Sequence, residues 1–179
     1  MPFVFVLGGA RSGKSALAQR LAAASGLPVV VVATAEPRDA DMAQRIRRHQ
    51  AERPRAWRTV EAPLDLLGAA RSAPTGSFLI VDCLTLWVSN LLEAGHDPSA
   101  IGEAAASVAD EVASYHAVVV SIEVGLGVVP DNELARTFRD TLGHVNAVFA
   151  SRAERSLLLV AGRALELRGA DDLLGLPPD

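Results

Sequence analysis

The stretch Gly8-Gly9-Ala10-Arg11-Ser12-Gly13-Lys14-Ser15 decides the fold of this chain. It matches the P-loop pattern G-x-x-x-x-G-K-[ST], whose backbone N–H groups turn toward phosphate oxygens. In that pattern the lysine reaches the β- and γ-phosphates, and the serine hydroxyl helps to hold Mg²⁺. Lys14 is the single lysine among 17 basic side chains, and arginine cannot replace a compact ammonium at such a position. We therefore predict phosphate binding, with Lys14 as a catalytic residue.

The residues on either side of this stretch support the prediction. Residues 3–7 form a short apolar run that suits a buried strand, and residues 15–24 have a helical pattern. The start of that helix would add its partial positive charge beneath the phosphates. A glycine-rich turn that merely begins a helix is the alternative. The sequence of strand, loop and helix favours the P-loop.

Strand and helix patterns alternate along the rest of the chain. Residues 101–115 carry apolar positions at i, i+3, i+4, i+7 and i+11, which is typical of a helix that covers a sheet. We expect further helices at 41–52 and 132–151, and strands at 28–34, 57–61, 78–81, 117–122 and 156–160, the last of the sheet. This order predicts an α/β fold with a doubly wound, mostly parallel sheet and helices on both faces. Ligands should bind beyond the carboxyl ends of the strands.

Composition limits the class of protein. The chain has 179 residues, 50% of them apolar, which suits one domain over residues 1–168 followed by a loose tail over 169–179. The N-terminal apolar run is short and lacks a basic region before it, so we expect no signal peptide, no membrane span and a cytoplasmic location. The formal charge of −4 argues against a nucleic-acid binder. The single cysteine, Cys83, lies in an apolar stretch and is expected to pack there.

Asp82 follows the apolar strand expected at 78–81. An acid at this place is typical of a Walker B strand, whose carboxylate holds Mg²⁺ beside the P-loop. We therefore predict a Mg²⁺ site made by Ser15 and Asp82. The alternative is an aspartate that caps the next helix.

An arginine-rich segment follows the second expected strand. Residues 38–58 contain seven arginines and three acids, which suits either a solvated face or a surface that guides polyphosphate. At helical spacing Arg45 and Arg53 flank His49, and nearby cations would keep the imidazole neutral and nucleophilic. A surface or half-buried histidine is the alternative, and His96, His116 and His144 are weaker candidates. The chain has no second lysine for the Asn-Lys-x-Asp motif with which switch GTPases read guanine.

Three blocks of the sequence resemble the bifunctional adenosylcobinamide kinase/adenosylcobinamide-phosphate guanylyltransferase family of cobalamin biosynthesis. The first is the P-loop stretch 8–15. The second runs from Ala33-Thr34 through Arg45-Ile46, His49 and Arg53-Pro54 to Trp57-Arg58-Thr59 and Glu61. The third comprises Glu123-Val124-Gly125 with later motif positions up to Asn146. The first block is shared by many P-loop proteins, whereas the other two look particular to this family.

The resemblance implies a RecA-like P-loop enzyme, often a homotrimer, that works on a corrinoid substrate with Mg²⁺, ATP and GTP. His49 matches the histidine that the family guanylylates. The nucleotide-binding positions of the family match Gly8, Gly9, Ala10, Arg11, Ser12, Gly13, Lys14, Ser15, Ala33, Thr34, Ala35, Gln50, Ala51, Glu52, Arg53, Glu61 and Asp82. The chain departs from the family pattern at Ile122 and Arg163, which leaves the substrate contacts and the C-terminal packing open.

The implied reaction has two stages. A hydroxyl of adenosylcobinamide takes the γ-phosphate of ATP or GTP, and His49 then accepts GMP from GTP and passes it on to give adenosylcobinamide-GDP. We expect the helix at 41–52 to move between the breaks at Pro37 and Pro54. A small-molecule kinase without a covalent intermediate, or a nucleotide-hydrolysing assembly protein, would also use a P-loop.

Overall fold

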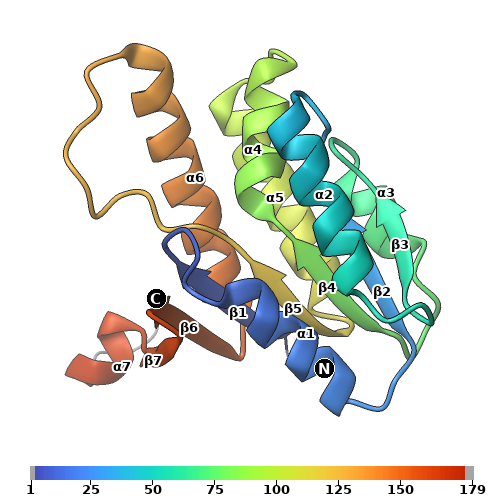
Figure 1. The fold of residues 1–179 in the computed structure, drawn as a ribbon. Helices are drawn as coiled ribbons and strands as arrows, with labels where there is room; N and C mark the ends of the chain where they lie inside the picture. Colours follow the sequence, from blue (N-terminus) through green and yellow to red (C-terminus); the bar gives the residue numbers. More distant parts are fainter. Residues whose placement is uncertain (1–2, 176–179) are drawn as a thin grey trace.

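The fold is a single mostly parallel sheet with helices on both faces (Figure 1). The computed structural model describes residues 3–175. Seven strands lie in the order β3-β2-β4-β5-β1-β6-β7, and only the β6–β7 pair is antiparallel. The strands are β1 (Phe3–Gly8), β2 (Val29–Ala33), β3 (Arg58–Glu61), β4 (Phe78–Asp82), β5 (His116–Val120), β6 (Arg155–Val160) and β7 (Arg163–Leu167).

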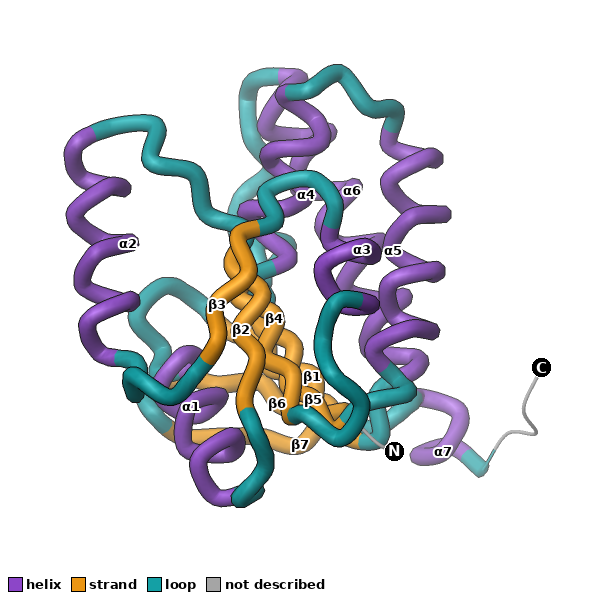
Figure 2. Tube along the Cα trace, turned by 90° about the vertical axis from the view of Figure 1, so that its right-hand side faces the viewer, coloured by secondary structure: helices purple, strands orange, loops and turns teal. Residues whose placement is uncertain are grey.

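The helices connect these strands. They are α1 (Lys14–Ala24), α2 (Ala40–Glu52), α3 (Leu66–Arg71), α4 (Leu84–Glu93), α5 (Pro98–Val112), α6 (Glu133–Arg152) and α7 (Ala170–Leu174). Helices α1 and α2 lie on one side of the sheet and α3 to α6 on the other (Figure 2). Among residues 3–175, no helix has the length and apolar character needed to cross a membrane.

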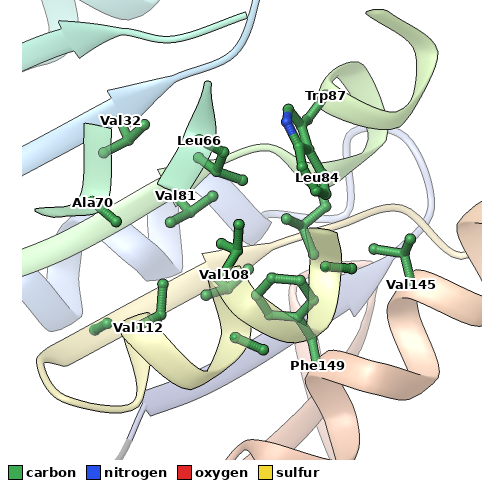
Figure 3. Close-up of a cluster of buried hydrophobic side chains, with 14 of the residues drawn as sticks. Val32, Leu66, Ala70, Val81, Leu84, Trp87, Val108, Val112, Val145 and Phe149 are labelled. Carbon is green, nitrogen blue, oxygen red and sulfur yellow. The ribbon is translucent and has the colours of Figure 1, made fainter. Parts of the chain in front are cut away.

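The two sides of the sheet are packed unequally. On the side of α3 to α6, side chains such as Leu84, Val108 and Phe149 pack against Val32 and Val81 of the sheet in one large cluster (Figure 3). On the other side the smaller cluster has only Ala18 and Ala22 of α1 as buried helical residues. Burial of apolar area, at about 25 cal/mol per Å², therefore fixes the first side more firmly than the second.

The expected elements are present, with their ends shifted by up to a few residues, but β7, α3, α4 and α7 were not predicted. The strand at 156–160 is not the last of the sheet, because the chain turns at Ala161 and Gly162, both at positive φ, and returns as β7. Helices α3 and α4 were not expected. Helix α4 is a short and mostly apolar run, which periodicity alone cannot assign to a helix or a strand, and α3 is shorter still.

The region expected as a loose tail contains α7, whose Leu173 and Leu174 are 64% and 72% exposed. Residues 176–179 of that tail lie outside the described residues. Its flexibility stays a prediction, as does the domain boundary at residue 168.

Candidate functional site

The P-loop joins β1 to α1 at the carboxyl edge of the sheet. Gly8 has φ +148°, and a Cβ added there would lie 2.3 Å from the carbonyl oxygen of Leu159 on the neighbouring strand. Gly13, the residue before α1, has φ +100°, and Arg11 also has a positive φ of 56°. Only glycine adopts the first two conformations easily. The glycines of the motif are thus explained by a close approach and a left-handed turn.

Lys14 lies inside the loop. It is 8% exposed, and its Nζ donates to the carbonyl oxygens of Gly8 at 2.8 Å and Gly9 at 2.7 Å. Ser12 Oγ is a third acceptor, at 3.4 Å. Burial lowers the pKa of the Lys14 ammonium, and the Asp82 carboxylate partly opposes this shift. Lys14 is therefore a desolvated cation that the loop itself orients.

Asp82 is the last residue of β4 and faces the arginine-rich helix. Its Oδ2 lies 3.7 Å from a guanidinium nitrogen of Arg53 and 4.0 Å from Nδ1 of His49. The capping alternative is wrong, because the N-cap of α4 is Cys83. The register places Asp82 beside Ala33 of β2 and Val120 of β5. Asp82 thus has the position expected of a Walker B acid.

Helix α2 brings His49 to this acid. Asp39 caps the helix by accepting a hydrogen bond from Met42 N at 2.6 Å, and none of the helical residues is buried. The predicted flanking of His49 holds for Arg45 in the helix. It does not hold for Arg53, which is the C-cap residue with an extended backbone and turns to Asp82 instead. Burial lowers the pKa of Arg53, and the attraction of Asp82 opposes the shift.

Two adjoining cavities meet at His49. A pocket of about 80 Å³ and a cleft of about 980 Å³ share Ser15, Arg45, His49, Asp82 and Cys83. Of the other predicted residues, Ala33, Ala35, Gln50, Arg53 and Glu61 line the pocket, and Ala10, Arg11, Ser12, Gly13, Lys14 and Glu52 line the cleft. Gln50 Nε2 donates to Glu61 Oε1 at 3.3 Å in the pocket wall. The P-loop and the histidine segment therefore face one continuous space.

Four predicted nucleotide-binding residues line neither cavity: Gly8, Gly9, Thr34 and Ala51. The two glycines act through carbonyl groups that hold Lys14. Thr34 is fully buried, and its hydroxyl donates to the Cys83 carbonyl at 2.7 Å and accepts from the Cys83 N–H at 2.9 Å. Thr34 thus fixes the backbone beside Asp82 rather than facing the cavities.

The sequence reasoning missed part of the pocket wall. Met42, Ile46 and Leu86 contribute apolar side chains, and Met42 and Ile46 share a helical face with His49 at i, i+4 and i+7. This spacing in the sequence could have indicated that the two side chains lie beside His49. Cys83 also lines the pocket, and burial together with the Asp82 charge raises the pKa of its thiol to about 11. The thiol is therefore neutral near pH 7.

The residues fit a Mg²⁺ ion accompanied by a nucleotide. Ser15 and Asp82 line one pocket and would supply hard oxygen ligands there, since Mg²⁺ takes one or two carboxylates together with phosphates and water. The described residues contain no group of three or more His, Cys, Asp or Glu side chains able to hold a metal alone. The remaining ligands would come from phosphate oxygens and water.

Comparison with known sequences identifies relatives over nearly the whole chain. A family model described as cobinamide kinase/cobinamide phosphate guanyltransferase matches residues 4–167. The bifunctional adenosylcobalamin biosynthesis protein CobP of Pseudomonas aeruginosa is 48% identical, with 92% of this chain and 96% of that protein covered. The protein CobU of Salmonella typhimurium is 39% identical, with 92% and 99% covered.

Solved structures agree on the fold. An ATPase of the type III secretion system of pathogenic bacteria superposes with a TM-score of 0.57 at 12% identity, over 89% of this chain and 51% of that chain. The RadB recombinase superposes with a TM-score of 0.52 at 16% identity, over 88% and 73%. At such identities the likeness concerns the fold alone, and it confirms the prediction of a P-loop NTPase sheet.

Proposed function

The chain belongs to the cobinamide kinase/cobinamide phosphate guanyltransferase family, and from that premise we propose that one nucleotide site performs both reactions, with His49 as a covalent carrier. The enzyme is an adenosylcobinamide kinase and adenosylcobinamide-phosphate guanylyltransferase of cobalamin biosynthesis. The observation that carries the proposal is that His49 and the P-loop face the same cleft.

In the kinase stage the corrinoid hydroxyl attacks the γ-phosphate of ATP or GTP and releases its proton to water, the bond to the β-phosphate oxygen breaks, and the nucleoside diphosphate leaves. Lys14 and the N–H groups of the P-loop stabilise the charge that develops on the transferring group. For this, Lys14 exchanges the carbonyl groups of Gly8 and Gly9 for phosphate oxygens. A bound Mg²⁺ would neutralise further phosphate charge, with Ser15 and Asp82 as its protein ligands.

In the guanylyl-transfer stage a nitrogen of His49 attacks the α-phosphate of GTP and pyrophosphate leaves. The phosphate of the corrinoid then attacks the same phosphorus, the P–N bond breaks, and His49 is restored. Nδ1 faces Asp82 at 4.0 Å, so we assign the attack to Nε2 and the orientation of the ring to Asp82. Arg45, Arg47 and Arg48 line the same cleft as the P-loop, and their charge favours polyphosphate binding.

The smaller pocket suits the base of GTP. Glu61 and Gln50 present a carboxylate and an amide side by side, 3.3 Å apart. A carboxylate accepts from the N–H groups on one edge of guanine, and an amide can donate to its carbonyl. Met42 and Ile46 offer apolar surface to the ring. We therefore assign the preference for GTP in the second stage to this pocket.

Incubation with GTP labelled in the α-phosphate tests the proposal. The protein should retain one GMP per chain in a linkage that survives alkali and breaks in acid, as a histidine phosphoramidate does. His49→Ala should lose the label while keeping kinase turnover, because the first stage needs the P-loop but no covalent intermediate. His96→Ala, at an exposed loop position, is the matched control and should keep the label.

Label that remains in His49→Ala would refute the assignment and direct attention to His96, His116 and His144. An unlabelled parent that still phosphorylates the corrinoid would support a kinase without a covalent intermediate. Hydrolysis of nucleotide with no phosphorylated corrinoid would support an assembly protein instead.

We also propose that the enzyme is a homotrimer in the cytoplasm. Leu126, Val128, Val129 and Leu134 are between 60% and 95% exposed in one protomer, near the start of α6. All five residues of the edge strand β7 are exposed as well. Several exposed apolar side chains close together in the sequence, such as those between Leu126 and Leu134, are typical of contact surfaces. Light scattering coupled to size exclusion should give three times the mass of 18.8 kDa.

A further inference from the structure

The helix that carries His49 has little packing of its own. No residue of α2 is buried, and the helix stands beside the sheet with loops at both of its ends (Figure 2). The contacts at its C-terminal end come from His49, Gln50 and Arg53. These side chains are the ones that the proposed reactions use, so a bound nucleotide competes for them. The position of α2 relative to the sheet therefore depends on the contacts made at its first turn.

Arg38 directly precedes the N-cap residue of α2, and side chains of α4 bind Arg38. Its guanidinium donates to Asn90 Oδ1 at 2.7 Å and to Glu36 Oε2 at 2.9 Å. It also forms an ion pair with Glu93, which lies one turn beyond Asn90. Forked contacts of a guanidinium with several acceptors fix both its position and its direction. The next residue, Asp39, is the N-cap of α2.

Asn90 is itself rigidly placed. It is 4% exposed, and its Nδ2 donates to the carbonyl oxygens of Thr34 at 2.8 Å and Pro63 at 2.9 Å. The amide oxygen is thereby directed to Arg38. Thr34 in turn is bonded twice to the backbone of Cys83, the neighbour of Asp82. One chain of hydrogen bonds therefore connects the beginning of α2 to the backbone that presents the Walker B acid.

We propose that Arg38 and Asn90 are positioning residues. They form a clamp that fixes the beginning of α2 and so determines the position of His49 relative to the α-phosphate in guanylyl transfer. The inference rests on the proposed covalent role of His49. His49 lies nine positions after Ala40, which is roughly 14 Å along a helix, so a swing of 10° at the clamp would displace His49 by about 2.4 Å. An error of about 1 Å in a reacting atom is enough to slow a reaction 100-fold.

The test is Arg38→Ala, compared with Arg152→Ala. The two arginine side chains are similarly exposed, at 38% and 33%, and Arg152 pairs with Asp110 far along the chain from α2. We expect Arg38→Ala to form the GMP adduct at least tenfold more slowly in a single turnover, with kinase turnover within about threefold of Arg152→Ala. Arg38→Lys keeps the charge without the fork, and its rate should lie between those of Arg38→Ala and the parent.

A second measurement does not depend on the chemistry. Amide hydrogen exchange over residues 40–52 should be faster in Arg38→Ala than in Arg152→Ala, while exchange in α5 stays the same. Equal exchange in α2, or equal loss of both activities in Arg38→Ala, would overturn the clamp. If the parent forms no GMP adduct, the covalent role of His49 fails, and the exchange measurement still decides whether the clamp holds α2.

Discussion

Replacing Lys14 with arginine should abolish phosphoryl transfer although the charge is kept. The Lys14 ammonium fits between two carbonyl oxygens at 2.8 and 2.7 Å, in a side chain that is only 8% exposed. A planar guanidinium is wider, and forcing extra atoms into a packed site costs about 1 to 3 kcal/mol of stability. For a chain of this length that corresponds to a melting temperature lower by about 2 to 12 °C.

The loss in rate should be larger than the loss in stability. Removing one aligned donor from a developing oxyanion costs about 2.7 to 4 kcal/mol, which is a factor of about 100 to 1,000 in turnover. The assay is phosphorylation of adenosylcobinamide with ATP and with GTP, below the melting temperature of the variant. Arg20→Lys, the reverse exchange at an exposed position of the same helix, is the control and should be neutral. Activity of Lys14→Arg within about threefold of the parent would show that Lys14 is not the phosphate-binding lysine.

Three further perturbations test the same geometry. Asp82→Asn should raise the Mg²⁺ concentration needed for half-maximal activity at fixed GTP, because an amide is a poor Mg²⁺ ligand; an unchanged Mg²⁺ titration would contradict the Walker B role. The Cys83 thiol should react slowly with iodoacetamide at pH 8, since a pKa raised from 9.0 to about 11 leaves about 100-fold less thiolate than in an ordinary cysteine. The same pKa shift should make the folded protein less stable as pH rises from 9 to 11. Alkylation as fast as that of free cysteine would refute both expectations. Trp87→Phe removes the hydrogen bond from Nε1 to the Leu64 carbonyl at 2.8 Å and should cost about 1 kcal/mol in urea unfolding, with the kinase rate kept; unchanged stability would show that water replaces the bond.

The sequence predicts those parts of the site that depend on local patterns. The P-loop, Asp82 at a strand end and His49 on a polar helix are each recognisable within about ten residues, and all three lie where the α/β alternation places them. The resemblance to the family also named the role of His49, which spacing alone left open. That role remains a prediction, supported by the position of His49 over the cleft.

The parts that the sequence did not predict depend on contacts between distant residues. The resemblance implied that Thr34 binds nucleotide, yet its hydroxyl forms a hydrogen bond with the backbone of Cys83, 49 residues away. Asn90 is one of four polar residues in the mostly apolar helix α4, and its partner Thr34 lies 56 residues before it. The range of helix α4 was not predicted because a short and mostly apolar run can be either a helix or a strand. No periodicity within one element can reveal such pairings.

The ion pair between Arg53 and Asp82 has a consequence for how ligands and helix influence each other. The guanidinium lies 3.7 Å from Oδ2 of Asp82, the carboxylate of the proposed Mg²⁺ site. Two cations beside one carboxylate repel each other, so cation affinity and the docking of the C-terminal end of α2 are linked with opposite sign. Because such coupling is reciprocal, a mutation that loosens this end of α2 should tighten cation binding, by at most the coupling free energy. Arg53 therefore competes with the metal for Asp82, and the Arg53–Asp82 ion pair should break when the nucleotide and its metal bind.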